Sequence, residues 1–182
     1  MEKAKNQTGL INVAMTLGTY LGLYQIAKYA LIVLSLKSAL FSLLLMAVII
    51  GVPFFVYFLI KRYRNKHTEG YFPFAISWIL TLTTIFFATI LSVMVCYLYL
   101  RYIDRGELFD SIIIQMQNMK EFYSNSGITD PESVISQLDM IIDLFKSMTI
   151  MELTKQLLSI SLFWGNLISI AVALFTAKNK KQ

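Results

Sequence analysis

The chain has 182 residues, of which 57% are apolar and only 15% are charged, and its formal net charge is +5. A soluble domain carries about 25% charged residues, and one of this length cannot remove so much apolar surface from water. The composition therefore excludes an ordinary soluble domain and predicts a chain that lies largely in lipid. The single cysteine, Cys96, excludes an internal disulfide and a CxxC redox pair.

Four stretches are long and apolar enough to cross a bilayer as helices, since about 20 apolar residues span the hydrocarbon at 1.5 Å each. Three of them lack charged residues, and the first contains only Lys28. We predict spans over residues 10–36, 38–60, 74–100 and 157–175. The first apolar stretch is too long for a signal-peptide core, so we expect an uncleaved signal anchor.

The segment between the third and fourth spans differs from the spans. Its apolar residues follow a helical period in two runs, Phe109 to Tyr123 and Val134 to Met148, separated by the turn signal Asn125-Ser126-Gly127. Thr129-Asp130-Pro131-Glu132 adds a helix-start signature with a capping box. We predict an amphipathic helical hairpin over residues 107–150. The expected fold is an all-α, four-span bundle that forms one membrane domain over residues 1–182.

Basic residues predict the orientation of the spans. Short basic clusters directly follow the second and fourth spans: Lys61, Arg62, Arg64 and Lys66, then Lys178, Lys180 and Lys181. The positive-inside rule places both termini and the 61–72 loop in the cytoplasm, and the hairpin outside. Residues 101–153 hold nine acidic and four basic residues. The hairpin is therefore acidic.

The first basic cluster also predicts a partner. Lys61, Arg62, Arg64 and Lys66 lie beside the membrane, where anionic lipid headgroups are the default ligand. The cluster is short and belongs to no recognisable nucleic-acid-binding module, so nucleic acid is not expected.

Several chemistries are excluded or disfavoured by absent residues. No Asp or Glu lies inside a predicted span, which argues against a proton-coupled transporter. The only histidine, His67, excludes a bis-histidine haem site, and no HExxH, GxSxG or phosphate-binding glycine loop occurs. We expect no cofactor and no enzyme. Lipid-headgroup chemistry by Asp104, Glu107 or Asp110 has little support, since such carboxylates also suit a helix N-terminus.

Polar residues within the spans suggest a candidate intramembrane site. Lys28 is read either as a ligand or headgroup site, with Tyr24 and Gln25 on its helical face, or as a lysine that snorkels to the interface, and we favour the second reading. Thr81 and Thr84 belong to a weakly polar stripe along the third span, together with Ser77, Ala88 and Ser92.

Small residues recur at helix-packing spacing. Gly18 and Gly22 continue from Ala14 in the first span, and the fourth span carries Ser161, Gly165, Ser169 and Ala173, with Asn166 beside them. Such ladders suit oligomerisation and partner binding or packing inside the chain's own bundle. We favour the second interpretation, because a bundle needs such faces in any case.

Three groups of residues together resemble domain of unknown function 4199, a family of bacterial membrane proteins common in Bacteroidota. They are Lys61-Arg62-Tyr63-Arg64-Asn65-Lys66 with Gly70 and Phe74-Ala75, Tyr99-Leu100-Arg101-Tyr102-Ile103-Asp104, and Gly165-Asn166 with Ala173-Leu174-Phe175. The resemblance implies a four-span inner-membrane protein and supplies no activity.

Two functions follow as hypotheses. The first is a non-enzymatic membrane subunit, scaffold or accessory factor that works through helix packing, as a homo-oligomer or with a membrane-protein partner. The alternative is a small transporter or channel for apolar or cationic solutes along the stripe of the third span.

Overall fold

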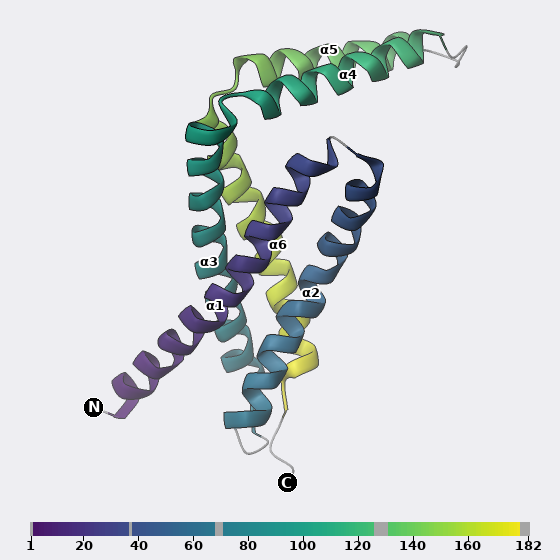
Figure 1. Cartoon of the computed structure of the whole chain (residues 1–182). Coiled ribbons are helices and arrows are strands. Elements are labelled where there is room, and N and C mark those ends of the chain that lie inside the picture. Colours follow the sequence, from purple (N-terminus) through teal and green to yellow (C-terminus); the bar gives the residue numbers. More distant parts are fainter. Residues whose placement is uncertain (1, 37, 68–70, 126–130, 179–182) are drawn as a thin grey trace. The chain divides into compact units, whose positions relative to one another are not determined.

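The computed structural model describes residues 2–36, 38–67, 71–125 and 131–178, and these are almost entirely helical (Figure 1). The elements are α1 (Glu2–Ser35), α2 (Ala39–His67), α3 (Phe74–Tyr99), the π-helical turn η1 (Leu100–Asp104), α4 (Glu107–Asn125), α5 (Pro131–Ser147) and α6 (Ile150–Thr176). Within these described ranges, four segments are long and apolar enough to cross a membrane: Gly9–Ser35, Ala39–Lys66, Phe74–Asp104 and Ile150–Thr176. The prediction of an all-helical chain with four such helices is confirmed.

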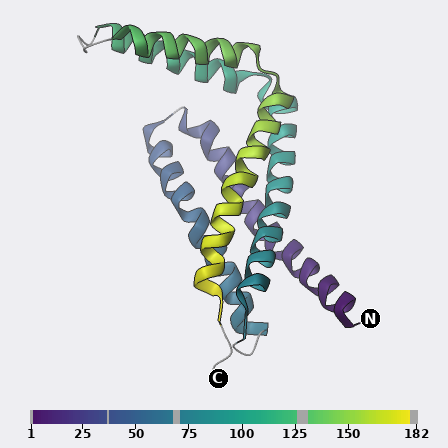
Figure 2. The same ribbon diagram turned by 180° about the vertical axis from the view of Figure 1, so that it is seen from behind.

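The chain divides into two compact units. The bundle unit comprises Met1–Cys96 and Gln156–Gln182, and the helix-pair unit comprises Tyr97–Lys155. Within the bundle unit, α3 and α6 lie side by side in both views (Figures 1 and 2). The first residues of α1 and the last of α6 lie toward the same end of this unit, as an even number of crossings requires.

The core of the bundle unit is built from α1, α2, α3 and α6 and from the segment before α3. Its buried apolar residues include Leu21 of α1, Ile60 of α2 and Leu80 of α3, together with Phe72. Phe72 also pairs with Lys178 through two backbone hydrogen bonds of 2.9 and 2.8 Å. This pairing joins the segment before α3 to the segment after α6.

The helix α6 begins at Ile150, earlier than the start predicted at residue 157. The reason is a capping box that precedes the apolar run. The amides of Thr149 and Glu152 each donate to the other residue's side chain, at 2.8 and 3.2 Å. Because this reciprocal pair satisfies two amides of the first turn, the helix is stable before its apolar residues begin.

The helix α2 extends beyond its predicted end at residue 60, through the basic cluster to His67. Lysine and arginine are good helix formers, and no glycine or proline interrupts this stretch. The basic side chains are therefore displayed at helical spacing.

A tight turn leads into α4 of the helix-pair unit. Arg105 and Gly106 both have positive φ values, 51° and 103°. The buried Asp104 accepts a hydrogen bond of 3.0 Å from the Leu108 amide. This carboxylate therefore satisfies an otherwise unpaired amide in the first turn of α4.

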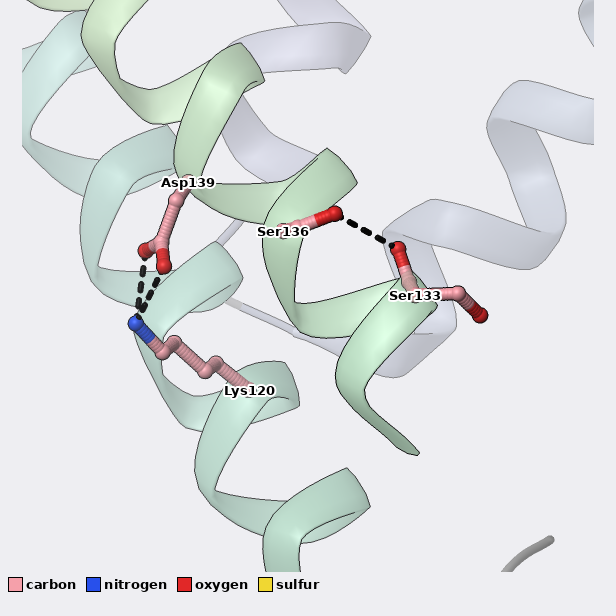
Figure 3. A network of polar contacts seen from close by, with 4 residues as sticks. All are labelled: Lys120, Ser133, Ser136 and Asp139. Atoms are coloured by element: carbon pink, nitrogen blue, oxygen red, sulfur yellow. Dashed lines mark hydrogen bonds and ion pairs between the residues drawn. The ribbon is translucent and has the colours of Figure 1, made fainter. Parts of the chain in front are cut away.

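The helices α4 and α5 pack against each other (Figures 1 and 2). Phe109 and Phe145 meet edge to face at 6.2 Å, and Lys120 binds both carboxylate oxygens of Asp139 at 2.6 and 2.7 Å (Figure 3). These two charged side chains are 37% and 49% exposed, so the pair contributes less than about 1 kcal/mol. The helix-start residues Thr129 and Asp130 lie outside the described residues.

Candidate functional site

Hydroxyl side chains of α3 form a buried polar seam: Ser77, Thr81, Thr84, Thr89 and Ser92, all 0% exposed. At one end, Ser77 and Thr176 of α6 share a hydrogen bond of 2.6 Å, and Thr81 donates to the Ser77 carbonyl at 2.7 Å. Trp78 donates to Ser169 of α6 at 3.1 Å. This half of the seam joins α3 to α6.

The other end of the polar seam joins α3 to α1. Ser92 donates to the side-chain oxygen of Gln25 at 2.9 Å, and both residues are buried. In lipid such an interhelical hydrogen bond contributes about 0.6 kcal/mol. The sequence analysis singled out Gln25, but it did not identify Ser92 as its partner on α3.

Thr84 and Thr89 stand apart within the polar seam. Among the described residues, neither side-chain hydroxyl has a hydrogen-bond partner. A hollow of about 300 Å³ lies nearby between α3 and α6, but Leu82, Thr83, Ile85, Phe86 and Leu162 line it. Thr81 and Thr84, the predicted candidates, do not.

The structure separates Lys28 from the helpers that the sequence suggested. Tyr24 donates its hydroxyl to the Val48 carbonyl of α2 at 2.9 Å, and Gln25 is bound to Ser92. The Tyr24 hydroxyl and the Gln25 side-chain oxygen thus have partners other than Lys28. The Lys28 ammonium lies 4.6 Å from the centre of the Tyr29 ring.

The three predicted packing glycines lie where helices approach closely. A β-carbon added to Gly18 would lie 2.8 Å from Cβ of Phe87 and 3.0 Å from the Thr84 carbonyl oxygen. At Gly22 the nearest atom would be Cδ2 of Leu91, at 2.8 Å, and at Gly165 it would be Cγ2 of Ile85, at 2.5 Å. All three glycines thus face α3.

The polar members of the α6 ladder have different surroundings. Ser169 is buried, Ser161 is half-buried and Asn166 is exposed. Ser169 also donates to the Asn166 carbonyl at 2.7 Å, so Asn166 contributes its backbone rather than its side chain to this contact.

The basic cluster of α2 divides between two helix faces. Arg64 donates to the Thr176 carbonyl of α6 at 2.9 Å and to Asn65 at 3.1 and 3.0 Å. The other three cations, Lys61, Arg62 and Lys66, are exposed. They line an open groove of about 460 Å³, which we call the basic groove. Its lining consists of Tyr57, Phe58, Lys61, Arg62, Asn65 and Lys66.

The groove contains three residues that the sequence analysis did not single out. Tyr57, Phe58 and Asn65 stand four residues from Lys61 or Arg62 and so share their face of the helix. This spacing was the available signal.

The described residues thus contain four membrane-length helices, and the polar seam joins three of them, α1, α3 and α6; this is a multi-span helical membrane protein. A profile of the family described as "Protein of unknown function (DUF4199)" matches residues 16–178, and the chain belongs to this family. The family resemblance found in the sequence is confirmed. No curated protein and no solved structure matches the chain significantly.

Proposed function

We propose that the chain is a non-enzymatic component of a bacterial inner membrane that acts through helix contacts, as a subunit, scaffold or accessory factor. The observation that supports this proposal is that hydroxyls of the polar seam form hydrogen bonds within the chain itself. Its hydrogen bonds from Ser77, Thr81 and Ser92 are made to neighbouring residues of the chain's own helices. A reaction centre or solute path requires polar groups that a ligand can reach.

The outer face of α2 supplies the contact surface. It carries large apolar side chains that are more than half exposed: Leu40, Leu43, Met46, Ile50, Phe54 and Phe58. Lipid chains or an apolar face of another membrane helix would cover these residues in a bilayer.

The proposed orientation has both termini in the cytoplasm and the α4–α5 hairpin outside. The pairing of Phe72 with Lys178 supports it, since this contact brings the segment that follows the first basic cluster to the first residue of the second. One side of the membrane then holds both clusters, as the positive-inside rule favours.

Crosslinking in native membranes tests the proposed role. A photoreactive residue at Phe54, which is 68% exposed, should capture a second copy or another membrane protein. The same residue at Val56, which is 0% exposed, should react only within the chain and serves as the control. Lipid adducts alone from Phe54, with a monomeric protein in mild detergent, would contradict the proposal.

A small transporter or channel is the second candidate. The observation in its favour is a pair of buried hydroxyls without hydrogen-bond partners among the described residues, those of Thr84 and Thr89. Buried polar groups normally have hydrogen-bond partners, and one without a partner can bind a water molecule or a solute.

Thr84→Val separates the two functions. Because the Thr84 hydroxyl has no partner, its removal should leave the free energy of unfolding unchanged or raise it by up to about 1 kcal/mol. Under the leading proposal, liposomes containing wild type or variant conduct no more cationic dye than empty liposomes. Flux through the wild type that falls in Thr84→Val would favour the transporter. Thr81→Val is the matched comparison, since that hydroxyl is bonded to Ser77.

A further inference from the structure

The basic groove has the chemistry of an anion site. Lys61, Arg62 and Lys66 line it, and among the described residues no carboxylate does. The Asn65 side-chain oxygen accepts two hydrogen bonds from Arg64, so its amide N–H groups remain as the donors available to the groove. The charged and amide groups of the lining therefore offer donors to a ligand.

The shape of the groove matches a lipid rather than a free anion. It follows one face of α2 from Tyr57 to Lys66, a distance of about 14 Å along the helix. Its first residues, Tyr57 and Phe58, continue the apolar span, and its last ones are polar. This gradient from apolar to cationic along the helix axis is the order in which a phospholipid presents its acyl chain and its phosphate.

Two contacts hold the groove in this form. The Lys61 ammonium lies 5.1 Å from the centre of the Tyr57 ring, which keeps the cation against the groove wall. On the opposite face of α2, Val56 and Ile60 are fully buried, so the exposed side of this helix segment is fixed.

We propose that the basic groove binds the phosphate of an anionic phospholipid, with Lys61, Arg62 and Lys66 around the headgroup and Phe58 beside the acyl chain. The inference adds a lipid ligand to the proposed function. It depends neither on a protein partner nor on which end of the bundle faces the cytoplasm.

Native mass spectrometry of the full-length protein in detergent tests the site. Phosphatidylglycerol should bind first and more tightly than phosphatidylcholine. Arg62→Gln and Lys66→Gln should each raise the Kd for the first phosphatidylglycerol about fivefold, as expected for the loss of one cation beside a lipid phosphate. Arg62→Lys should retain most of the affinity. Circular dichroism of every variant checks that it is folded.

Lys178→Gln is the matched control. Lys178 is exposed and lies outside the groove, and its backbone rather than its side chain pairs with Phe72. The Kd should stay unchanged in this variant. An equal loss of affinity in Lys178→Gln would mean diffuse attraction by net charge and would overturn the inference. So would displacement of the lipid by inorganic phosphate, which would assign the groove to a soluble anion.

Discussion

Gly18→Ala is expected to lower the free energy of unfolding of the bundle by about 1–3 kcal/mol, the usual effect of adding a methyl group to a packed contact. The new methyl group would meet Cβ of Phe87 at 2.8 Å and the Thr84 carbonyl oxygen at 3.0 Å. Neither atom can move away by a rotation of its side chain, because one is a backbone atom and the other is bonded directly to the backbone. Titration with sodium dodecyl sulfate in mixed micelles, followed by circular dichroism, measures the effect.

Two other glycines of α1 provide controls for this prediction. Gly9 has no atom within 4 Å of an added β-carbon, so Gly9→Ala should be neutral or, through the better helix propensity of alanine, slightly stabilising. Gly22→Ala should cost less than Gly18→Ala, because its closest contact is the mobile end of the Leu91 side chain. If Gly18→Ala were as mild as Gly9→Ala, then α1 and α3 would not approach each other as described.

The same glycines indicate how far sequence reasoning can go. Spacing of four residues placed Gly18 and Gly22 on one face of the first span, because a helix fixes which residues share a face. It did not identify α3 as the helix that this face meets. The choice of neighbour depends on complementary side chains elsewhere, such as Phe87 and Leu91, and one sequence contains no direct record of that pairing.

The basic cluster illustrates the same limit for the candidate site. Lys61, Arg62, Arg64 and Lys66 are equivalent as charges, and the sequence assigned all four to lipid. Their helical positions separate them: Arg64 lies toward α6 and binds a carbonyl 112 residues away, whereas Arg62 lines the basic groove.

The start of α6 shows a different limit. The residues of its capping box, Thr149 and Glu152, are present in the sequence, but they precede the apolar run from which the start of the span was predicted.

Arg64→Gln should destabilise the bundle by about 2 kcal/mol. The Thr176 carbonyl lies at the end of α6, where helix carbonyls lack partners within the helix. Arg64 satisfies this carbonyl and the Asn65 side-chain oxygen together, through separate nitrogens. A glutamine is too short to span both acceptors, and hydrogen bonds from a charged donor contribute about 1.5–3 kcal/mol. The midpoint of the detergent titration should fall accordingly.

Arg62→Gln provides the opposite result in the same two measurements. It removes an exposed guanidinium that lines the basic groove, so the unfolding midpoint should stay within the error of the wild type while the affinity for phosphatidylglycerol falls. Arg64→Gln should lower the unfolding midpoint. Its affinity for phosphatidylglycerol should fall less than that of Arg62→Gln, because Arg64 affects the groove only through its hydrogen bonds to Asn65. Equal losses of stability in the two variants would mean that α2 does not present Arg64 to α6. In that case, the positions of Arg62 and Arg64 around the helix would not explain different roles for the two residues.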